Sequence, residues 1–428
     1  MKLYKILSCV VLISLLIAAC GGVKTTEAPA VSEPVTLEFW NGFNAHEVDT
    51  LNQMIEKYWA PTHPNIKINA KGEVGPDEIL TAVSGGTTID VAILWDPYSV
   101  KAWAKQGALV DLSPYIQKAN VKLEDIFIPA GLEWVGQVDG KYYGLPFVNF
   151  DRGFYYNKEL FRKAGLDPEK PPTTIAELED YARKLTIIEN GEIQQLGWAI
   201  NQDPGNMIEL ALAFGGNFYD KATGKITAND PKIVQALTWD LNLAKEFGLE
   251  KVNTFMAGFA GEGNDPFMLG KVAMTIEGCW SVTFIEKQGI KLDYGVGAVP
   301  SSDPAYAQSN DLETNPLIIP KTTKYPDEAW EFLWFLASNP DVSREFANLV
   351  SNIPQVKAAM ANFSSEPKTM VFVNLSNSPN ARGWAPIPVV AFYSTEWTTA
   401  VEKLYAGQAE PKEALDVVTQ NVQAEADK

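Results

Sequence analysis

The chain has 428 residues, with 35 basic and 53 acidic side chains and a formal net charge of −18. An acidic balance of this size argues against a nucleic-acid partner and against electrostatic attraction to anionic lipid. A chain of this length exceeds what one hydrophobic core usually spans, so we expect two lobes.

The N-terminus has the pattern of a secretory signal peptide over residues 1–19. Two lysines precede an apolar run over residues 6–19, which is shorter than the roughly 20 residues that a membrane span needs. Cys20 follows two alanines and resembles the bacterial lipobox, in which the cysteine is acylated and becomes the first mature residue. Residues 20–34 are typical of a flexible tether. We expect an extracytoplasmic protein, held to the cell membrane by the Cys20 lipid; an ordinary signal peptide or an uncleaved anchor is the alternative.

The few cysteines and histidines limit which disulfides and metal sites the mature chain can form. Beyond Cys20 the mature chain carries only Cys279, so we expect no intramolecular disulfide although the compartment would allow one. His46 and His63 form no cluster with the spacing of zinc ligands, and no glycine-rich phosphate loop is present. The sequence therefore predicts no metal and no cofactor.

Strands and helices alternate at the start of the mature chain. Residues 35–40 alternate like a strand, and apolar positions at helical spacing follow within 51–59. A second strand is predicted at 66–70, and a helix at 79–83. The nearly continuous apolar run at 89–94 is typical of a strand that is buried on both faces of a sheet. This alternation predicts an α/β domain.

The rest of the chain carries the same two periodicities. Thr174 and Glu177 fit a capping box at the start of a helix that continues to Leu185. The patterns farther along predict a strand and a glycine-containing turn within 267–280, a strand at 294–300, a helix at 326–336 and a helical region after 387.

Several short motifs occur along the mature chain in a fixed order. They are Pro146 with Tyr156-Asn157-Lys158, Gly165-Leu166 and Pro172-Thr173, then Gly270-Lys271-Val272-Ala273-Met274 with Gly278 and Trp280, then Pro320-Lys321 before Glu328-Ala329-Trp330-Glu331-Phe332-Leu333, and Ile353-Pro354. This order resembles the extracellular solute-binding proteins of bacterial ABC importers (family 1), in the carbohydrate-binding branch that includes maltose-binding protein.

The resemblance implies an α/β fold of the periplasmic-binding-protein kind with type II topology, in which two lobes flank a ligand cleft. It implies a first lobe of residues 35–148 and 301–351 and a second lobe of residues 149–300 and 352–428. It also implies a monomer that is not an enzyme, that captures a carbohydrate by lobe closure and that delivers it to the transmembrane subunits of an ABC permease. Periplasmic binding proteins are themselves a standard example of hinge closure around a ligand.

Candidate ligand contacts of the first lobe lie at strand ends, where open α/β sheets bind their ligands. A sugar needs planar polar side chains beside aromatic platforms. Trp40 and Asn41 end the first predicted strand, and Trp95 and Asp96 end the third. The alternative for each tryptophan is packing in the core. Further candidates in the loop after the first strand are Asn44 and Glu47.

In the second lobe, Trp280 lies where the family's motif places a ring that stacks on the sugar. Glu277, just before it, is a candidate hydrogen-bond acceptor. Asp203 falls where maltose-binding protein carries an acidic residue before a proline.

Three other candidates follow the predicted crossings between lobes. Asn149 and Asp151 come just after the first crossing, where a neighbouring arginine makes a structural ion pair the alternative for Asp151. Trp384 is a candidate late aromatic wall. Ser394 stands where maltose-binding protein has a stacking tryptophan, and this departure argues against a maltose-type ligand.

Two other functions remain open from the sequence. The same fold could bind a polyamine, a metal chelate or a small peptide, and Asp96, Asp203 and Glu277 would supply carboxylates for a polyamine. A secreted glycoside hydrolase would need two carboxylates roughly 5 to 9.5 Å apart across a sugar. Nothing in the sequence marks such a pair.

Overall fold

The computed structural model describes residues 34–135, 137–200, 203–259, 265–361 and 363–428. The predicted signal peptide, Cys20 and nearly all of the predicted tether therefore lie outside the described residues. Within the described ranges, no helix combines the length and the apolar character that crossing a bilayer requires.

The larger sheet contains six strands of the described chain, in the order β16-β6-β15-β3-β1-β2. Strands β2 and β3 run parallel to β1 on its two sides, whereas β15 runs antiparallel between β3 and β6. The bounds of these strands are β1 Val35–Asn41, β2 Ile66–Lys71, β3 Val91–Ile93, β6 Gly144–Phe150, β15 Glu313–Ile318 and β16 Ile353–Pro354. A segment from late in the chain thus lies inside the sheet that the N-terminal strands begin.

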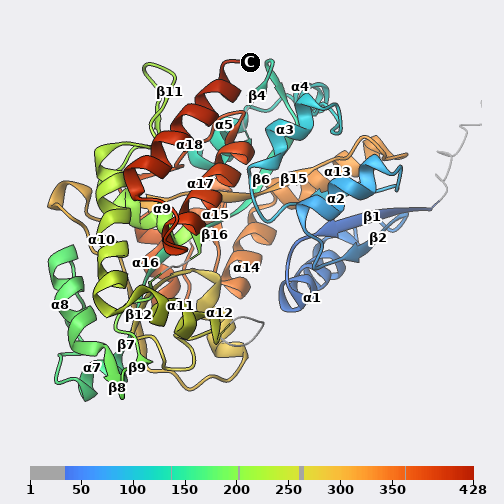
Figure 1. Ribbon diagram of the computed structural model, residues 1–428. Coiled ribbons are helices and arrows are strands. Elements are labelled where there is room, and N and C mark those ends of the chain that lie inside the picture. The colour runs from blue at the N-terminus through green and yellow to red at the C-terminus, as the bar shows by residue number, and fades with distance from the viewer. Residues whose placement is uncertain (1–33, 136, 201–202, 260–264, 362) are drawn as a thin grey trace, which may run out of the picture.

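Helices pack around this sheet to form the first lobe (Figure 1). The first helix continues through the π-helical turn η1, and its buried side chains include Leu51, Met54 and Trp59, as their spacing predicts. The bounds are α1 Ala45–Met54, η1 Ile55–Trp59, α2 Pro76–Ser84, α3 Ser99–Lys105, α4 Ser113–Ala119, α5 Leu123–Ile126, α6 Pro129–Val135, α13 Pro326–Ser338, α14 Pro340–Val350 and α15 Lys357–Met360.

The second lobe is built on a smaller antiparallel sheet, in the order β12-β7-β13, with β7 in the middle. The bounds are β7 Arg152–Asn157, β12 Met274–Gly278, β13 Tyr294–Gly297, α7 Lys158–Lys163, α8 Ile175–Leu185, α9 Pro204–Ala213, α10 Pro231–Phe247, α11 Leu249–Ala257, α12 Trp280–Lys287, α16 Pro367–Ser376, α17 Val390–Tyr405 and α18 Pro411–Ala426. Short pieces complete the described chain, namely β4 Gln137–Val138, β5 Lys141–Tyr142, β8 Ile187–Glu189, β9 Glu192–Gln195, β10 Tyr219–Asp220, β11 Lys225–Ile226, η2 Pro304–Tyr306, β14 Asn310–Asp311 and β17 Ala381–Arg382.

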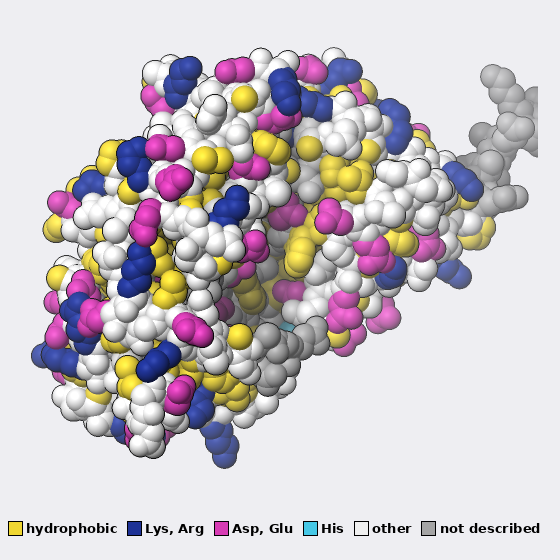
Figure 2. All heavy atoms as spheres, in the orientation of Figure 1, with side chains coloured by type: hydrophobic (Ala, Val, Ile, Leu, Met, Phe, Trp, Pro, Cys, Tyr) yellow, Lys and Arg dark blue, Asp and Glu magenta, His cyan; other side chains and the backbone are white. Residues whose placement is uncertain are grey.

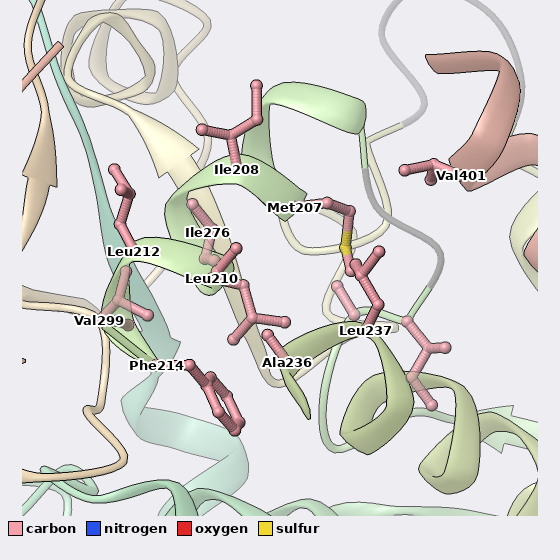
Figure 3. Close-up of a cluster of buried hydrophobic side chains, with 14 of the residues drawn as sticks. Met207, Ile208, Leu210, Leu212, Phe214, Ala236, Leu237, Ile276, Val299 and Val401 are labelled. Carbon is pink, nitrogen blue, oxygen red and sulfur yellow. The ribbon is translucent and has the colours of Figure 1, made fainter. Parts of the chain in front are cut away.

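The core of the second lobe surrounds α9. Met207, Ile208 and Leu210 from this helix pack with side chains of α10, β12 and α17, among them Leu237 and Val401 (Figure 3). A helix that is apolar nearly all round belongs in a core, and every residue of α9 from position 206 to 213 is buried. The core of the second lobe therefore fixes the position of α9.

The predicted capping box at the start of α8 is confirmed. The Thr174 hydroxyl accepts a hydrogen bond from the Glu177 N–H (3.2 Å), and the Glu177 carboxylate accepts one from the Thr174 N–H (3.1 Å). The expected turn after residue 278 is shorter than the pattern implies, because Trp280 already begins α12.

The chain passes between the two sheets several times. It leaves the large sheet at Asp151, between β6 and β7, and re-enters it at Glu313 through residues 298–312. Residues 353–354 were expected in the second lobe but pair as β16 with β6, which places them in the large sheet. The predicted α/β fold with two lobes is confirmed by this arrangement.

Candidate ligand-binding site

A cavity of about 560 Å³ lies between the two lobes and receives side chains from both. Figure 2 shows the surface hollowed at this boundary, with hydrophobic and acidic side chains around the hollow. The lining residues are Gly42, Phe43, Asn44, Glu47, Trp95, Asp96, Tyr98, Phe150, Arg152, Asp203, Asn206, Glu277, Trp280, Glu313, Asn315 and Asn352. A volume of this size is typical of a small-molecule site.

Two tryptophans bring aromatic surface into the cavity from different lobes. Trp95 lies two residues after the end of β3, and 58% of its surface is exposed, which is unusual for so large an apolar ring. Trp280 begins α12 in the second lobe and contacts Phe150 edge to face, with ring centroids 5.8 Å apart. The site therefore offers a ring on each side, one exposed at Trp95 and one half-buried against the core at Trp280.

The N-terminus of α1 contributes a polar pair from the first lobe. The Asn44 side chain accepts a hydrogen bond from the Glu47 N–H (3.2 Å), while the Glu47 carboxylate accepts one from the Asn44 N–H (3.0 Å). This capping box fixes both side chains at the cavity wall. Burial raises the pKa of Glu47 to about 7, against the smaller lowering effect of the Asn44 N–H.

Two further carboxyl groups of the wall form no ion pair with a basic residue of the described chain. Asp96 accepts a hydrogen bond from the Tyr98 N–H (2.8 Å), and burial raises its pKa to about 6. Glu277, at the end of β12, accepts a hydrogen bond from the Ser281 hydroxyl (3.2 Å), and burial raises its pKa to about 8. Both groups would gain from hydrogen-bond donors that a ligand brings into the cavity.

Arg152 is the single basic residue in the described lining, and it is already paired. Its guanidinium donates to the Glu313 carboxylate (3.2 Å), so this ion pair joins β7 of the second lobe to β15 of the first. The Tyr98 hydroxyl also donates to Glu313. Burial works against the charge on Arg152, but the carboxylate of Glu313 and that of Asp203 keep its pKa above the usual range. Because Arg152 and Glu313 neutralise each other, the remaining carboxyl groups give the cavity a negative net charge.

The cavity brings together seven of the twelve predicted contacts. The predicted residues in its lining are Asn44, Glu47, Trp95, Asp96, Asp203, Glu277 and Trp280. Asp203 is the N-cap of α9 and accepts a hydrogen bond from the Gly205 N–H (2.9 Å), which points the carboxylate to the boundary between lobes. Whether these residues contact a ligand remains a prediction.

The other predicted residues lie outside the described lining. Trp40 is half-buried under the Lys71 ammonium, which is 4.1 Å from the ring centroid, and Asn41 is fully buried. Asn149 is buried in β6 between its neighbouring strands. Asp151 is buried and accepts a hydrogen bond from the Ser376 hydroxyl (2.5 Å). Trp384 is buried behind the cavity, where its indole N–H donates to the Tyr98 hydroxyl (3.2 Å).

Several lining residues were not singled out from the sequence. They are Gly42, Phe43, Tyr98, Phe150, Asn206, Glu313, Asn315 and Asn352. Glu313 and Asn315 lie in the polar first half of β15, whose second half is apolar, and all six residues of the strand are buried. Among the described residues, no group of histidine, cysteine and acidic side chains has the arrangement of a metal site.

The chain belongs to the bacterial extracellular solute-binding proteins, whose family model matches residues 44–343. A solved structure of the protein CpMnBP1 with mannobiose bound is similar in fold, with a TM-score of 0.81 and 28% identity over 91% of this chain and 100% of that one. The maltotriose-binding protein of Pyrococcus abyssi is 25% identical over 77% of this chain and 68% of the relative. The sn-glycerol-3-phosphate-binding periplasmic protein UgpB of Escherichia coli K12 is 25% identical over 90% of this chain and 91% of the relative.

The family defines the class of function. The chain is the extracytoplasmic solute-binding component of an ABC importer and not an enzyme. The cavity between its lobes is the place where a protein of this architecture encloses a solute.

Proposed function

We propose that this protein captures a carbohydrate between its lobes and delivers it to an ABC permease. The main support is that Trp95 and Trp280, from two different lobes, line one cavity. Carboxylates and asparagines form much of its polar lining. The apolar face of a sugar ring packs on an aromatic side chain, and its hydroxyls satisfy the acids and amides around it.

Relatives support a carbohydrate ligand. CpMnBP1 has been solved with mannobiose and with mannotriose bound, at 28% identity in each case. A relative from P. abyssi is named for maltotriose. The relative UgpB is named for an anionic ligand, sn-glycerol-3-phosphate, but the single arginine of this cavity is paired with Glu313. The charge of the cavity therefore favours a neutral sugar over a phosphate ester.

A polyamine is the second candidate. The cavity wall carries five carboxyl groups against one arginine, which would suit a cationic amine. A thermal-shift screen separates the candidates, because a ligand that binds only the folded state raises the unfolding temperature. We expect neutral oligosaccharides to stabilise the protein. Stabilisation by spermidine and by no sugar would contradict the carbohydrate proposal.

The lipid anchor is proposed on the sequence of the N-terminus. Acylation of Cys20 would hold the folded body at the outer face of the membrane through the tether of residues 20–34. In a host with lipoprotein processing, Cys20→Ser is expected to release the protein from the membrane fraction or to leave the precursor uncleaved. A processed Cys20→Ser protein that still fractionates with membranes would contradict the proposal.

A further inference from the structure

A second cavity of about 620 Å³ adjoins the one already described. The two cavities share Asn44, Glu47 and Trp280 in their linings, so they adjoin at these three residues. The residues that line only the second are Ala45, His46, Glu73, Thr283, Phe284, Lys287, Gln288 and Val350. Each volume alone is of the size that buries a small-molecule ligand, so one hexose leaves most of the combined space empty.

One face of α12 forms a wall of the second cavity. Trp280, Thr283, Phe284 and Lys287 are spaced three, four and seven residues from the start, which places them along one side of the helix. Val282 and Ile285, which α12 buries, lie on its other side, whereas Thr283 on the cavity side is nearly buried and its hydroxyl is hydrogen-bonded to that of Ser351. Phe284 is 37% exposed and lines the cavity, so its ring is not part of the core.

The two aromatic residues on this face of α12 are separated by about one helical turn. Trp280 and Phe284 are four residues apart, which corresponds to a rise of about 6 Å along the helix. That step is comparable with the length of one sugar unit in a linear chain. A chain that stacks on Trp280 and continues along α12 would reach Phe284 with its next unit.

The facing wall offers polar groups of mixed charge. His46 lies in α1, where its ring nitrogen is 3.4 Å from the Leu349 carbonyl oxygen, and Glu47 is shared with the first cavity. Glu73 lies on the same side, and Lys287 and Gln288 lie at the end of α12. A lining with one lysine, two glutamates, two amides and an imidazole does not select a strongly charged ligand but does suit many hydroxyls.

We propose that the second cavity is a binding subsite for a further sugar unit, with Phe284 as its aromatic platform. This inference rests on the proposed function and extends it, because it makes the ligand a linear oligosaccharide that runs past Trp280 along α12. The first cavity holds the unit between Trp95 and Trp280, and the second holds the unit or units that follow.

Calorimetry with mannose, mannobiose, mannotriose and mannotetraose, and with glucose and the maltose series, tests the subsite. The wild-type protein is expected to gain affinity when the chain becomes long enough to enter the second cavity. Phe284→Ala is expected to lose that gain, roughly three- to tenfold, while affinity for the shortest sugar that binds stays unchanged.

Phe392→Ala is the matched control. Phe392 is 38% exposed, nearly the same as Phe284, but it lies on α17 and lines a different cavity. Its replacement is expected to leave the whole chain-length series as in the wild type. The unfolding temperature of both variants confirms that they are folded.

The outcomes separate the subsite from the proposed function. An equal gain with chain length in wild type and Phe284→Ala would overturn the subsite and leave the carbohydrate proposal standing. An equal loss for short and long sugars would also overturn it, because Phe284 would then act on the first cavity. Failure of every sugar to bind the wild-type protein would overturn both.

Discussion

The indole ring of Trp280 lies directly over Gly278. A Cβ on Gly278 would be 2.1 to 2.3 Å from three carbons of the six-membered ring, so no side chain fits there while the ring keeps its place. The same ring is 5.7 Å from the Arg152 guanidinium and in edge-to-face contact with Phe150. The orientation of the Trp280 ring in the cavity therefore depends on the absence of a side chain at position 278.

Gly278→Ala is expected to displace the Trp280 ring and to weaken ligand binding by up to roughly tenfold, the range of one aromatic stacking contact. The dissociation constant measured by calorimetry checks this. Gly297→Ala is the control, because Gly297 lies in β13 of the same sheet and a Cβ there would meet no atom within 4 Å. Wild-type affinity in Gly278→Ala would show that the ring position does not matter for binding.

Trp95→Ala is expected to weaken binding by about 1 kcal/mol and to leave the unfolding temperature nearly unchanged. The reason is that the Trp95 ring is 58% exposed and so contributes little to the core. Trp198→Ala, in contrast, should lower the stability of the protein. Its ring is fully buried and its indole N–H donates to Asp240 (2.8 Å), so the loss of stability should be about 3–5 kcal/mol. A large fall in stability in Trp95→Ala would place that ring in the core.

Removing Arg152 alone is expected to destabilise the ligand-free protein by about 3–5 kcal/mol, because it leaves the buried Glu313 carboxylate without its cation. Urea unfolding of Arg152→Met measures this cost. The double variant Arg152→Met with Glu313→Gln is expected to recover a large part of it, since no charge is then left unpaired. A double variant that is no more stable than Arg152→Met would mean that the ion pair does not hold the lobes together.

Stability is expected to fall as the pH rises between about 4.5 and 8, with Glu209 as one cause. Glu209 is fully buried and accepts a hydrogen bond from the Asp311 N–H (2.9 Å), and burial raises its pKa from 4.5 to about 8. In that window the folded state holds a proton that the unfolded state has lost, so each such group lowers the free energy of unfolding by about 1.4 kcal/mol per pH unit as the pH rises.

The variant Glu209→Gln should flatten this pH dependence in urea unfolding at pH 5, 6, 7 and 8. Glu192→Gln, an exposed residue of β9, is the control and should keep the wild-type slope. Parallel curves for wild type and Glu209→Gln would remove Glu209 as a cause.

Local patterns in the sequence predicted the elements that local interactions determine. The capping box of Thr174 and Glu177, and the alternation that gives β1, both depend on residues a few positions apart, and both are present in the structure. The exact start of α12 was not predicted, because a glycine such as Gly278 is equally compatible with the end of a strand and with the centre of a longer turn.

In the first lobe, cavity contacts were predicted at strand ends, whereas Asp203 and Trp280 of the second lobe were predicted from the family resemblance. Trp40 was predicted at the end of the first strand and Trp95 at the end of the third, yet Trp95 lies two residues past the end of β3 while Trp40 is still within β1. Trp40 therefore takes a position fixed by the pleat, half-buried beside the core of the first lobe. The place where each strand ends, one residue after Trp40 and two residues before Trp95, separates the packed ring from the cavity ring.

Glu313 and Asn315 could not be predicted, because they reach the cavity through pairing over a long stretch of sequence. They lie in β15, which inserts antiparallel between β3 and β6 more than 160 residues after β6. Nothing near residue 313 specifies that register. The same insertion brings Glu313 to Arg152 and thereby sets the charge of the site.

We propose that one solute is enclosed between two lobes that close on it. Trp95 and Asp96 contribute from the first lobe, and Asp203, Glu277 and Trp280 from the second, so neither lobe alone is a complete site. A ligand that contacts both should shift the population to the closed form. Small-angle X-ray scattering with and without a saturating oligosaccharide should show a smaller radius of gyration in the bound protein. An unchanged radius, with binding confirmed by calorimetry on the same sample, would contradict closure.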